Sequence, residues 1–301
     1  MRLPFLTKTN NRKTAWEKWP KWDSKNSFRT PRFNFSCPGS DYSGKTTREK
    51  ISLLKNRELL EIYRNLTIDT PIRSIFEIGF FQGGMPLFLA DMIAPEKIVA
   101  VDWLPPSEEL LSLIACHSLS SSIELVGGID QADTGRIRSI LDERFGSEPL
   151  DLIIDDCSHY YAQTKACIEA LFGYLKPGGK YVIEDWGWTH WPEAPWQTNE
   201  SPFRSTESMT NLIFELVMAL GSDHSVISGN DHSVISGITI PNSYCVIITR
   251  GANLPYKAPI DLRRMTHLAG GRQAKLIVGK QTHSTDNGAD VNGADAPLKP
   301  R

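Results

Sequence analysis

The stretch LDLIIDDCSH, residues 150–159, decides the fold expected for this 301-residue chain. It is a short apolar run that ends in two adjacent acids and is followed by a histidine. A second run of this kind, KYVIED at residues 180–185, also ends in two acids. Such runs are typical of strands buried in a parallel sheet. Because neighbouring parallel strands lie about 4.8 Å apart, the sequence predicts that both acidic ends meet at one edge of that sheet.

Three carboxylates would then share a small volume, those of Asp156, Glu184 and Asp185. Such a cluster is repulsive unless a proton or a cation lies within it. A hard divalent cation that prefers oxygen ligands is the simplest solution, so we interpret these residues as metal ligands. His159 is a candidate general base. Two alternatives stay open: His159 is a helix N-terminal residue bonded to a carboxylate, or Asp185 is a lone base while Glu184 forms an ion pair.

Strand and helix patterns alternate along most of the chain. We expect strands at residues 74–80, 97–103, 122–128, 150–156 and 179–185. We expect helices at residues 43–66, 83–93, 107–118, 133–145, 159–175 and 203–220. Alternation at this spacing predicts an α/β fold with a doubly wound, mostly parallel sheet. Two further β-runs, at residues 232–240 and 244–249, predict a hairpin that places an antiparallel strand at the sheet edge.

Composition divides the chain into three parts. Residues 1–45 are basic and contain three tryptophans, and we expect them to form a loosely ordered arm. Residues 46–255 form the main domain. Residues 256–301 form an extension that is polar and repetitive from about residue 280, where we expect disorder. No apolar run reaches the roughly 18–20 residues of a membrane helix, so we expect no membrane partner and a cytoplasmic location.

The first expected strand ends in a glycine-rich turn, EIGFFQGG at residues 77–84. Such a turn, here built on Gly79 and Gly83, lets a ligand approach the backbone at a helix N-terminus. A dinucleotide fingerprint requires glycine where Phe81 stands, so a pyrophosphate is disfavoured. Glu77 adds negative charge beneath the turn and therefore favours a cofactor that carries positive charge.

Acidic residues also end the next two strands. Asp102 is placed to accept hydrogen bonds from ribose hydroxyls, and Asp130 with Gln131 suits the edge of an adenine. Together these features indicate a nucleoside ligand that lacks a pyrophosphate and carries a positive charge. S-adenosylmethionine fits that description. The alternative interpretation is that these acids cap helices.

The ordered set of motifs resembles a known family. From about residue 70 to 250 the chain resembles class I S-adenosylmethionine-dependent methyltransferases, whose seven-stranded sheet has a reversed final strand. Asp-Asp-x-Ser-His followed by Glu-Asp resembles the Mg²⁺-dependent sugar O-methyltransferases of macrolide biosynthesis and the related group named cephalosporin hydroxylases. The resemblance implies that Asp156, Glu184 and Asp185 bind Mg²⁺ and that His159 is the base. It also implies a set of residues around the cofactor, namely Glu77, Gly79, Gly83, Asp102, Asp130 and Asp155.

We therefore expect a Mg²⁺-dependent O-methyltransferase that acts on a hydroxyl of a small molecule, either a sugar or a natural-product glycoside. A nucleic-acid partner is disfavoured because the acidic site would repel phosphates, and a homo-oligomer is left open. An iron-dependent hydroxylase or oxidase on the same fold is one alternative, and a non-catalytic nucleoside-binding module is another. The tryptophan-rich segment at residues 186–196 is either a substrate-binding wall or a satellite core packed on the tryptophans of the arm.

Overall fold

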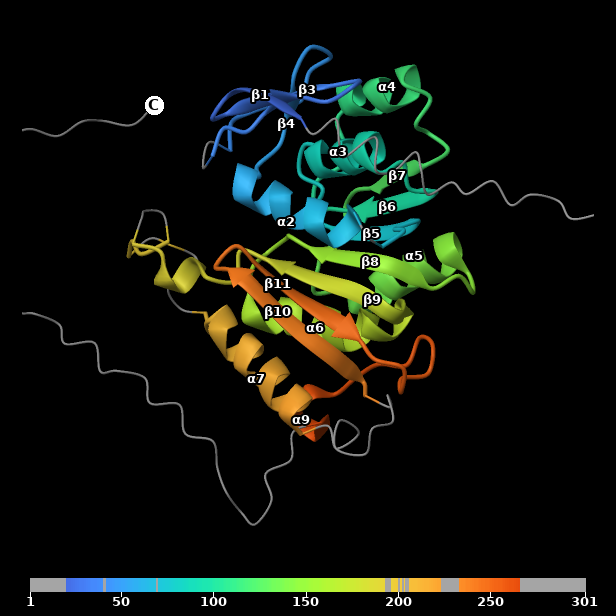
Figure 1. Cartoon of the computed structure of the whole chain (residues 1–301), viewed down its shortest axis with the longest axis vertical. Helices are drawn as coiled ribbons and strands as arrows, with labels where there is room; N and C mark the ends of the chain where they lie inside the picture. The colour runs from blue at the N-terminus through green and yellow to red at the C-terminus, as the bar shows by residue number, and fades with distance from the viewer. Residues whose placement is uncertain are drawn as a thin grey trace, which may run out of the picture. The chain divides into compact units, whose positions relative to one another are not determined.

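A seven-stranded sheet forms the centre of the fold in the computed structural model (Figure 1). Its strands are β5 (Ser74–Ile78), β6 (Lys97–Val101), β7 (Ile123–Val126), β8 (Leu150–Asp155), β9 (Leu175–Glu184), β10 (Ile235–Asn242) and β11 (Cys245–Arg250). They lie in the order β10-β11-β9-β8-β5-β6-β7. Strands β5 to β9 pair in parallel, whereas β11 is antiparallel to both β9 and β10. The predicted seven-stranded, mostly parallel sheet with an antiparallel edge is confirmed.

The structure describes residues 20–265, except for 40–41, 69, 193–195, 200, 202, 204–205 and 223–232. Its helices are α2 (Arg57–Ile68), α3 (Gly84–Met92), α4 (Glu108–Cys116), α5 (Thr134–Phe145), α6 (Tyr161–Leu171), α7 (Met209–Gly221) and α9 (Leu262–Met265). Each of these helices is too short or too polar to cross a lipid bilayer. The disorder expected from about residue 280 concerns residues outside this description.

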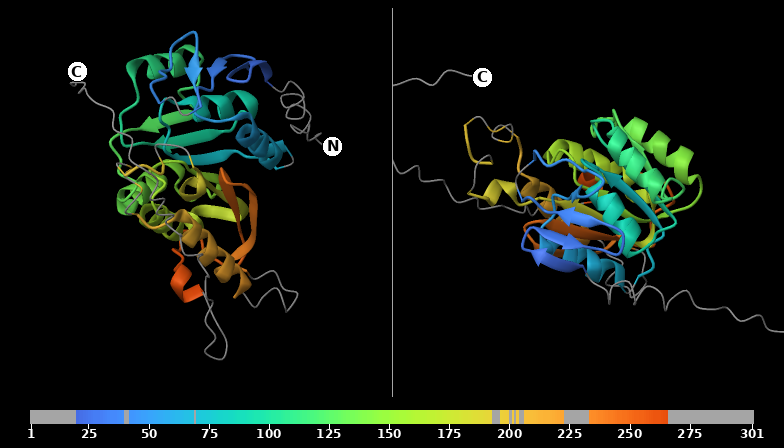
Figure 2. Two further views of the ribbon diagram at one scale, coloured as in Figure 1. Left: turned by 90° about the vertical axis from the view of Figure 1, so that its left-hand side faces the viewer. Right: turned by 90° about the horizontal axis from the view of Figure 1, so that it is seen from above.

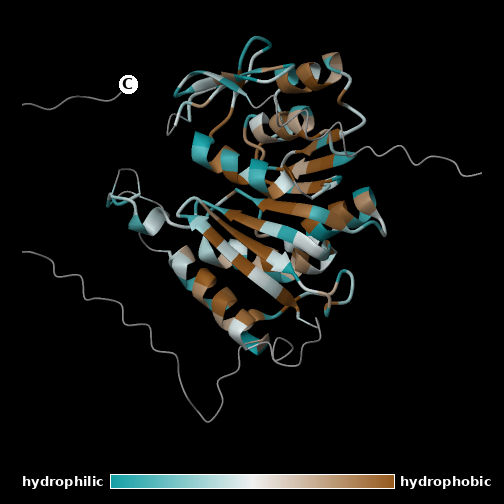
Figure 3. Cartoon of the chain, in the orientation of Figure 1, coloured by the Kyte–Doolittle hydropathy of each residue, from teal (hydrophilic) through white to brown (hydrophobic). Residues whose placement is uncertain are grey.

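Helices cover both faces of the sheet, as Figure 2 shows. Successive strand residues enter opposite cores: Leu152 and Ile154 pack with α2, α3 and α4, while Ile153 packs with α5, α6 and α7. This alternation is the two-residue period of a strand, and here both faces are apolar because both are covered. The central strands are accordingly among the most hydrophobic parts of the molecule (Figure 3).

Part of the basic arm is folded, which corrects the expectation of loose order for the residues that the structure describes. Four short strands form a second sheet, β1 (Lys21–Ser24), β2 (Ser27–Arg29), β3 (Asn34–Ser36) and β4 (Ile51–Ser52). Phe28 and Phe35 are buried with ring centroids 4.8 Å apart, and both contact Phe88 of α3 edge-on. The prediction of loose order gave weight to the basic residues of the arm and overlooked these two phenylalanines.

The leading helix is shorter than predicted, because α2 begins at Arg57 and not near residue 43. The Asn56 side chain accepts a hydrogen bond of 2.8 Å from the Leu59 amide, which is the N-cap arrangement expected of asparagine. Residues 51–52 pair with β3 instead. The segment between β4 and α2 is therefore an extended connection, and it carries Lys55 towards the carboxyl ends of the central strands.

Candidate active site

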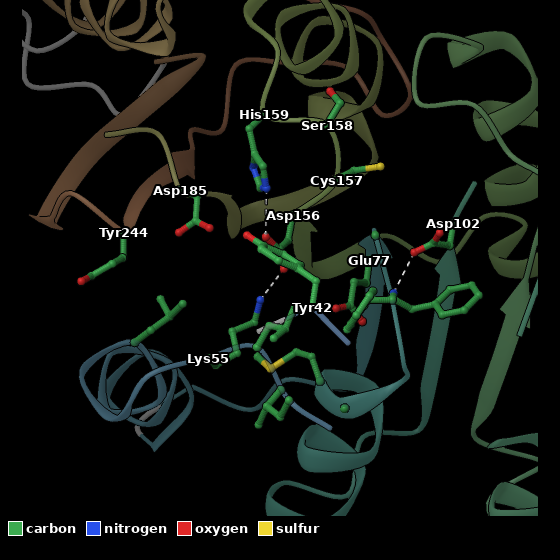
Figure 4. A pocket seen from close by; sticks show the side chains of 18 of the residues that line it. Tyr42, Lys55, Glu77, Asp102, Asp156, Cys157, Ser158, His159, Asp185 and Tyr244 are labelled. Carbon is green, nitrogen blue, oxygen red and sulfur yellow. Dashed lines mark hydrogen bonds and ion pairs between the residues drawn. The ribbon is translucent and has the colours of Figure 1, made fainter. Parts of the chain in front are cut away.

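A cavity of about 1080 Å³ lies at the carboxyl ends of β5, β6, β8 and β9 (Figure 4). Pockets for one small ligand typically measure roughly 300–1,000 Å³, so this one is generous for a single molecule. Most of the predicted site residues line it, namely Glu77, Gly79, Asp102, Asp130, Gln131, Asp156, His159 and Asp185. Three predicted residues, Gly83, Asp155 and Glu184, are not part of its lining.

One end of the cavity is acidic. The side chains of Asp156, His159 and Asp185 offer ligand atoms that all lie within 4.8 Å of one another, and these three residues are called the acidic end below. The His159 Nε2 atom is 3.9 Å from Asp156 Oδ1. Figure 4 shows Asp185 and His159 directed towards Asp156. The two carboxylates and the imidazole could thus bind one cation together. Alternatively, the carboxylates could bind the cation while the imidazole accepts a proton.

The backbone at the acidic end is strained. His159 and Asp185 have φ angles of 57° and 51°, in the left-handed region that non-glycine residues seldom adopt. The Asp185 amide is held by a 2.6 Å hydrogen bond to the Tyr244 carbonyl. Such conformations cost about 1–3 kcal/mol each and tend to occur at functional sites. Burial and the charge of Asp156 raise the pKa of Asp185, and His159 opposes that shift.

Glu184 lies apart from the acidic end. Its buried carboxylate accepts a 2.6 Å hydrogen bond from the Tyr63 hydroxyl and forms a 2.7 Å ion pair with the Lys55 ammonium. Lys55 also contacts Asp156. Of the two interpretations offered for Glu184, the ion pair is the arrangement present, and its role as a metal ligand stays a prediction. The cause is the strand period, which directs Glu184 to the face covered by α2.

Lys55 is the site residue that sequence reasoning missed. It is 5% exposed, and burial alone would lower the pKa of its ammonium. The charges of Asp156 and Glu184, with the hydrogen bonds to them, outweigh burial and raise that pKa, so the lysine is a cation in this setting. The sequence carried only a weak signal, a lysine that directly follows the apolar run ISLL, residues 51–54.

The opposite end of the cavity contains Glu77, Gly79 and Asp102 and is called the glycine-turn end below. Gly79 has a φ of +97°, and a Cβ atom there would lie 1.9 Å from the Asp156 carbonyl oxygen. The Gly79 amide donates to the Val101 carbonyl at 2.8 Å, and the Asp156 amide donates to the Ile78 carbonyl at 2.9 Å. A glycine is therefore required at position 79, where the ends of β5 and β8 approach closely. This close approach also fixes the position of Asp156.

Glu77 is 1% exposed, and neither of its carboxylate oxygens has a hydrogen-bond partner among the described residues. Burial raises its pKa well above the usual value, with the Lys55 charge opposing the shift. Buried polar groups in native proteins are almost always hydrogen-bonded, so each exception requires an explanation. Glu77 also lines the cavity, and its contact with a bound ligand stays a prediction.

Other predicted cofactor residues already have protein partners. The two Asp102 oxygens accept hydrogen bonds from the Phe81 amide at 2.7 Å and the Leu104 amide at 2.9 Å. Asp130 accepts from the Ala132 amide at 2.8 Å. Both carboxylates keep free lone pairs towards the cavity, since a carboxylate accepts about four hydrogen bonds. Their contact with a cofactor stays a prediction.

Asp155 and Gly83 support the site from outside the cavity. Asp155 accepts hydrogen bonds from the Tyr181 hydroxyl at 2.8 Å and the Gln131 amide group at 2.7 Å, on the face opposite Glu77. Burial raises the pKa of Asp155 to about 7. Gly83 precedes the first residue of α3, with a φ of 75°. Neither residue lines the cavity, and the predicted contact of each with a cofactor stays a prediction.

The tryptophan-rich segment contributes both to a core and to the cavity. Trp188 is buried, and its indole donates a 3.0 Å hydrogen bond to the His159 carbonyl. Trp191 and Trp196 line the cavity with ring centroids 5.3 Å apart. Trp22 of the arm packs on Phe28 instead of on this segment. The segment therefore fixes the backbone of His159 and presents aromatic surface beside the acidic end.

Comparison with known proteins agrees with this geometry. Residues 76–186, from β5 to the residue after Asp185, match the family described as "Methyltransferase domain". This segment of the chain is therefore similar to methyltransferase domains. The strand order of the sheet, with β11 reversed between β9 and β10, is the one expected of class I methyltransferases.

Curated proteins similar to this chain are named as O-methyltransferases. The demethylmacrocin O-methyltransferase of Streptomyces fradiae is 36% identical over 104 residues, which are 35% of this chain and 25% of the relative. The mycinamicin VI 2''-O-methyltransferase of Micromonospora griseorubida is 47% identical over 49 residues, or 16% of this chain and 12% of the relative. The chain thus spans about a quarter or less of the length of these relatives. A solved structure, the MycE methyltransferase with Mg, SAH and mycinamycin VI, is 23% identical over 66% of this chain and 50% of its own, with a TM-score of 0.46.

Proposed function

We propose that this protein transfers a methyl group from S-adenosylmethionine to a hydroxyl of a small, sugar-bearing molecule. The observation that carries the proposal is that one cavity holds an unpartnered buried Glu77 at one end and the Asp156, His159 and Asp185 group at the other. A cationic nucleoside cofactor would satisfy Glu77. An acceptor hydroxyl beside His159 would then lie between that cofactor and a base.

The donor set of the acidic end suits Mg²⁺. This ion prefers oxygen ligands and is commonly bound by one or two carboxylates together with waters or substrate oxygens. Asp156 and Asp185 would hold it, while Glu184 is neutralised by Lys55. When bound, a divalent cation lowers the pKa of a coordinated hydroxyl and stabilises the developing alkoxide.

His159 has the position of a general base. Its imidazole lies in the cavity wall, and its carbonyl is fixed by Trp188. A bound S-adenosylmethionine would supply an electrophilic methyl group, and on transfer of that group to the hydroxyl oxygen its sulfonium would become a neutral thioether. The hydroxyl proton passes to the imidazole, a contribution that general bases typically make at the level of about 10²–10⁴ in rate.

Aromatic residues favour a glycoside as the acceptor class. Trp191, Trp196 and Tyr244 line the cavity near Asp185. Aromatic faces bind the apolar faces of sugar rings and planar aglycones. The curated relatives are named as O-methyltransferases of demethylmacrocin, mycinamicin VI and a rhamnosyl tetracenomycin, and the rhamnosyl group of the last supports a glycoside acceptor.

The test is transfer of a labelled methyl group from S-adenosylmethionine to a panel of hydroxylated glycosides, with and without a chelator. We expect labelled ether product that disappears on chelation and returns with Mg²⁺. Turnover that persists after exhaustive chelation would contradict the metal role. Oxygen consumption with Fe²⁺ and no methyl transfer would support the hydroxylase alternative instead.

A further inference from the structure

Lys55 reaches the acidic end from the connection between β4 and α2. Its ammonium lies 2.7 Å from Glu184 Oε2 and in contact with Asp156 Oδ2. In Figure 4 it approaches Asp156 from the side opposite His159. The lysine is buried, and so is Glu184, so this pair is shielded from solvent screening.

The two carboxylates that Lys55 contacts are in different situations. Both Glu184 oxygens have a donor, Tyr63 on Oε1 and Lys55 on Oε2, so this carboxylate is satisfied by protein groups alone. Asp156 has Lys55 on Oδ2, while its Oδ1 faces His159 at 3.9 Å. Asp156 is therefore shared between a resident ammonium and the group that it forms with His159 and Asp185.

From this sharing we infer that Lys55 neutralises the carboxylates of Asp156 and Glu184 when no metal is bound. By competing for Asp156, the ammonium also lowers the affinity of the acidic end for a divalent cation. The inference rests on the metal site of the proposed function. It makes Lys55 a positioning residue, because it acts through Asp156. A positive charge close to a metal site weakens the binding of a cation there through electrostatic repulsion. This repulsion is strong where water does not screen it.

Two observable consequences follow from removal of the ammonium. The metal should bind more tightly, because both Asp156 oxygens become available and a positive charge is gone. The metal-free protein should be less stable, because Glu184 is left buried without its counter-ion. Added metal should restore part of that stability, since a ligand that binds only the folded chain stabilises it.

The experiment measures Mn²⁺ binding to the metal-stripped full-length protein by calorimetry, and thermal unfolding with chelator or Mg²⁺. Four proteins are compared: wild type, Lys55→Met, Lys55→Arg and Lys50→Met. Lys50 is exposed directly before β4 and is the matched control for loss of a charge. We expect Lys55→Met to bind Mn²⁺ at least about tenfold more tightly than wild type. Its melting temperature should be the most dependent on Mg²⁺, and both control variants should resemble wild type.

A purely structural role for Lys55 predicts lower stability with unchanged metal affinity, and that result would overturn the inference. Absence of Mn²⁺ binding by Lys55→Met would also overturn it, whereas the methyl-transfer assay tests the proposed function separately. If Lys55→Met fails to fold, the double variant Lys55→Met with Glu184→Gln removes both charges of the buried pair. This variant should fold in chelator and bind Mn²⁺ more tightly than Glu184→Gln alone, because these two proteins differ only at Lys55 and Asp156 is no longer shared. Equal or weaker binding would contradict the inference.

Discussion

The two ends of the cavity solve the problem of buried charge in opposite ways. At the glycine-turn end, Glu77 is buried without any protein partner among the described residues. Next to the acidic end, the buried Glu184 has protein partners on both oxygens, Tyr63 and Lys55, and Lys55 also contacts Asp156 of the acidic end. The difference teaches that buried carboxylates in one cavity can either lack a protein partner, as Glu77 does, or be bonded by protein groups, as Glu184 is.

Replacement of His159 should have the largest effect and would show that chemistry belongs to the acidic end. We expect His159→Ala to reduce methyl transfer by about 10²–10⁴, the usual contribution of a general base. Binding of S-adenosylmethionine, measured by calorimetry, should be within about threefold of wild type because Glu77 and the glycine turn are intact. His190, whose ring bonds Thr210, offers the matched control His190→Ala. Unchanged turnover in His159→Ala would remove this residue from the mechanism.

Gly79 joins the two ends, so a side chain there should damage both. We expect Gly79→Ala to lower the free energy of unfolding by about 3–5 kcal/mol, since a Cβ would meet the Asp156 carbonyl in addition to an unfavourable φ. Gly128 has a φ of +74° but open space around it, so Gly128→Ala should cost only about 1–2 kcal/mol. Denaturant unfolding measures both. Equal costs would mean that the close approach of β5 and β8 is not the constraint.

Removal of the Tyr63 hydroxyl tests how much its hydrogen bond to the Glu184 carboxylate contributes to stability. We expect Tyr63→Phe to cost about 1–3 kcal/mol of unfolding free energy, because a buried carboxylate loses a 2.6 Å hydrogen bond. Tyr256→Phe, which removes an exposed residue's hydroxyl bonded to the Glu148 carbonyl, is the control and should cost less than about 1 kcal/mol. A negligible cost at Tyr63 would indicate that Lys55 alone satisfies Glu184.

The last prediction concerns pH and the unpartnered Glu77. Burial raises the pKa of Glu77 in the folded chain above its ordinary value of 4.5. A carboxyl whose pKa is raised by folding stabilises the fold below its unfolded pKa, and that contribution is lost as pH rises towards the folded pKa. The unfolding free energy of the ligand-free wild type should therefore fall more steeply above about pH 4.5 than that of Glu77→Gln. The difference in slope should be up to about 1.4 kcal/mol per pH unit. Thermal unfolding from about pH 4.5 to about pH 8 measures the difference.

Saturating S-adenosylmethionine provides the control for that pH series. A cation beside Glu77 favours the charged carboxylate, so the cofactor should stabilise wild type more at high pH than at low pH. In Glu77→Gln this pH dependence should be reduced. If the two proteins respond identically, Glu77 is not the group that meets the cofactor's charge.

Several features of the site were readable from local patterns. Apolar runs followed by acids placed β5, β6, β8 and β9, and with them the positions of Glu77, Asp102 and Asp156. Asp155 could have been excluded from the cavity by the same two-residue period, because it follows Ile154 and so faces the core of α5, α6 and α7. The period also places Glu184 on the α2 side, away from Asp185.

The chain alone determined the sheet, its hairpin edge and the convergence of acidic strand ends, because burial periodicity is local and each strand carries its own pattern. Tertiary structure decided which carboxylates stay available to a ligand. Lys55 meets Glu184 across 129 residues, and no local pattern specifies a partner at that separation. The left-handed turns that aim His159 and Asp185 at Asp156 are likewise held by distant groups, since bonds from Trp188 and Tyr244 stabilise conformations that these residues do not prefer alone.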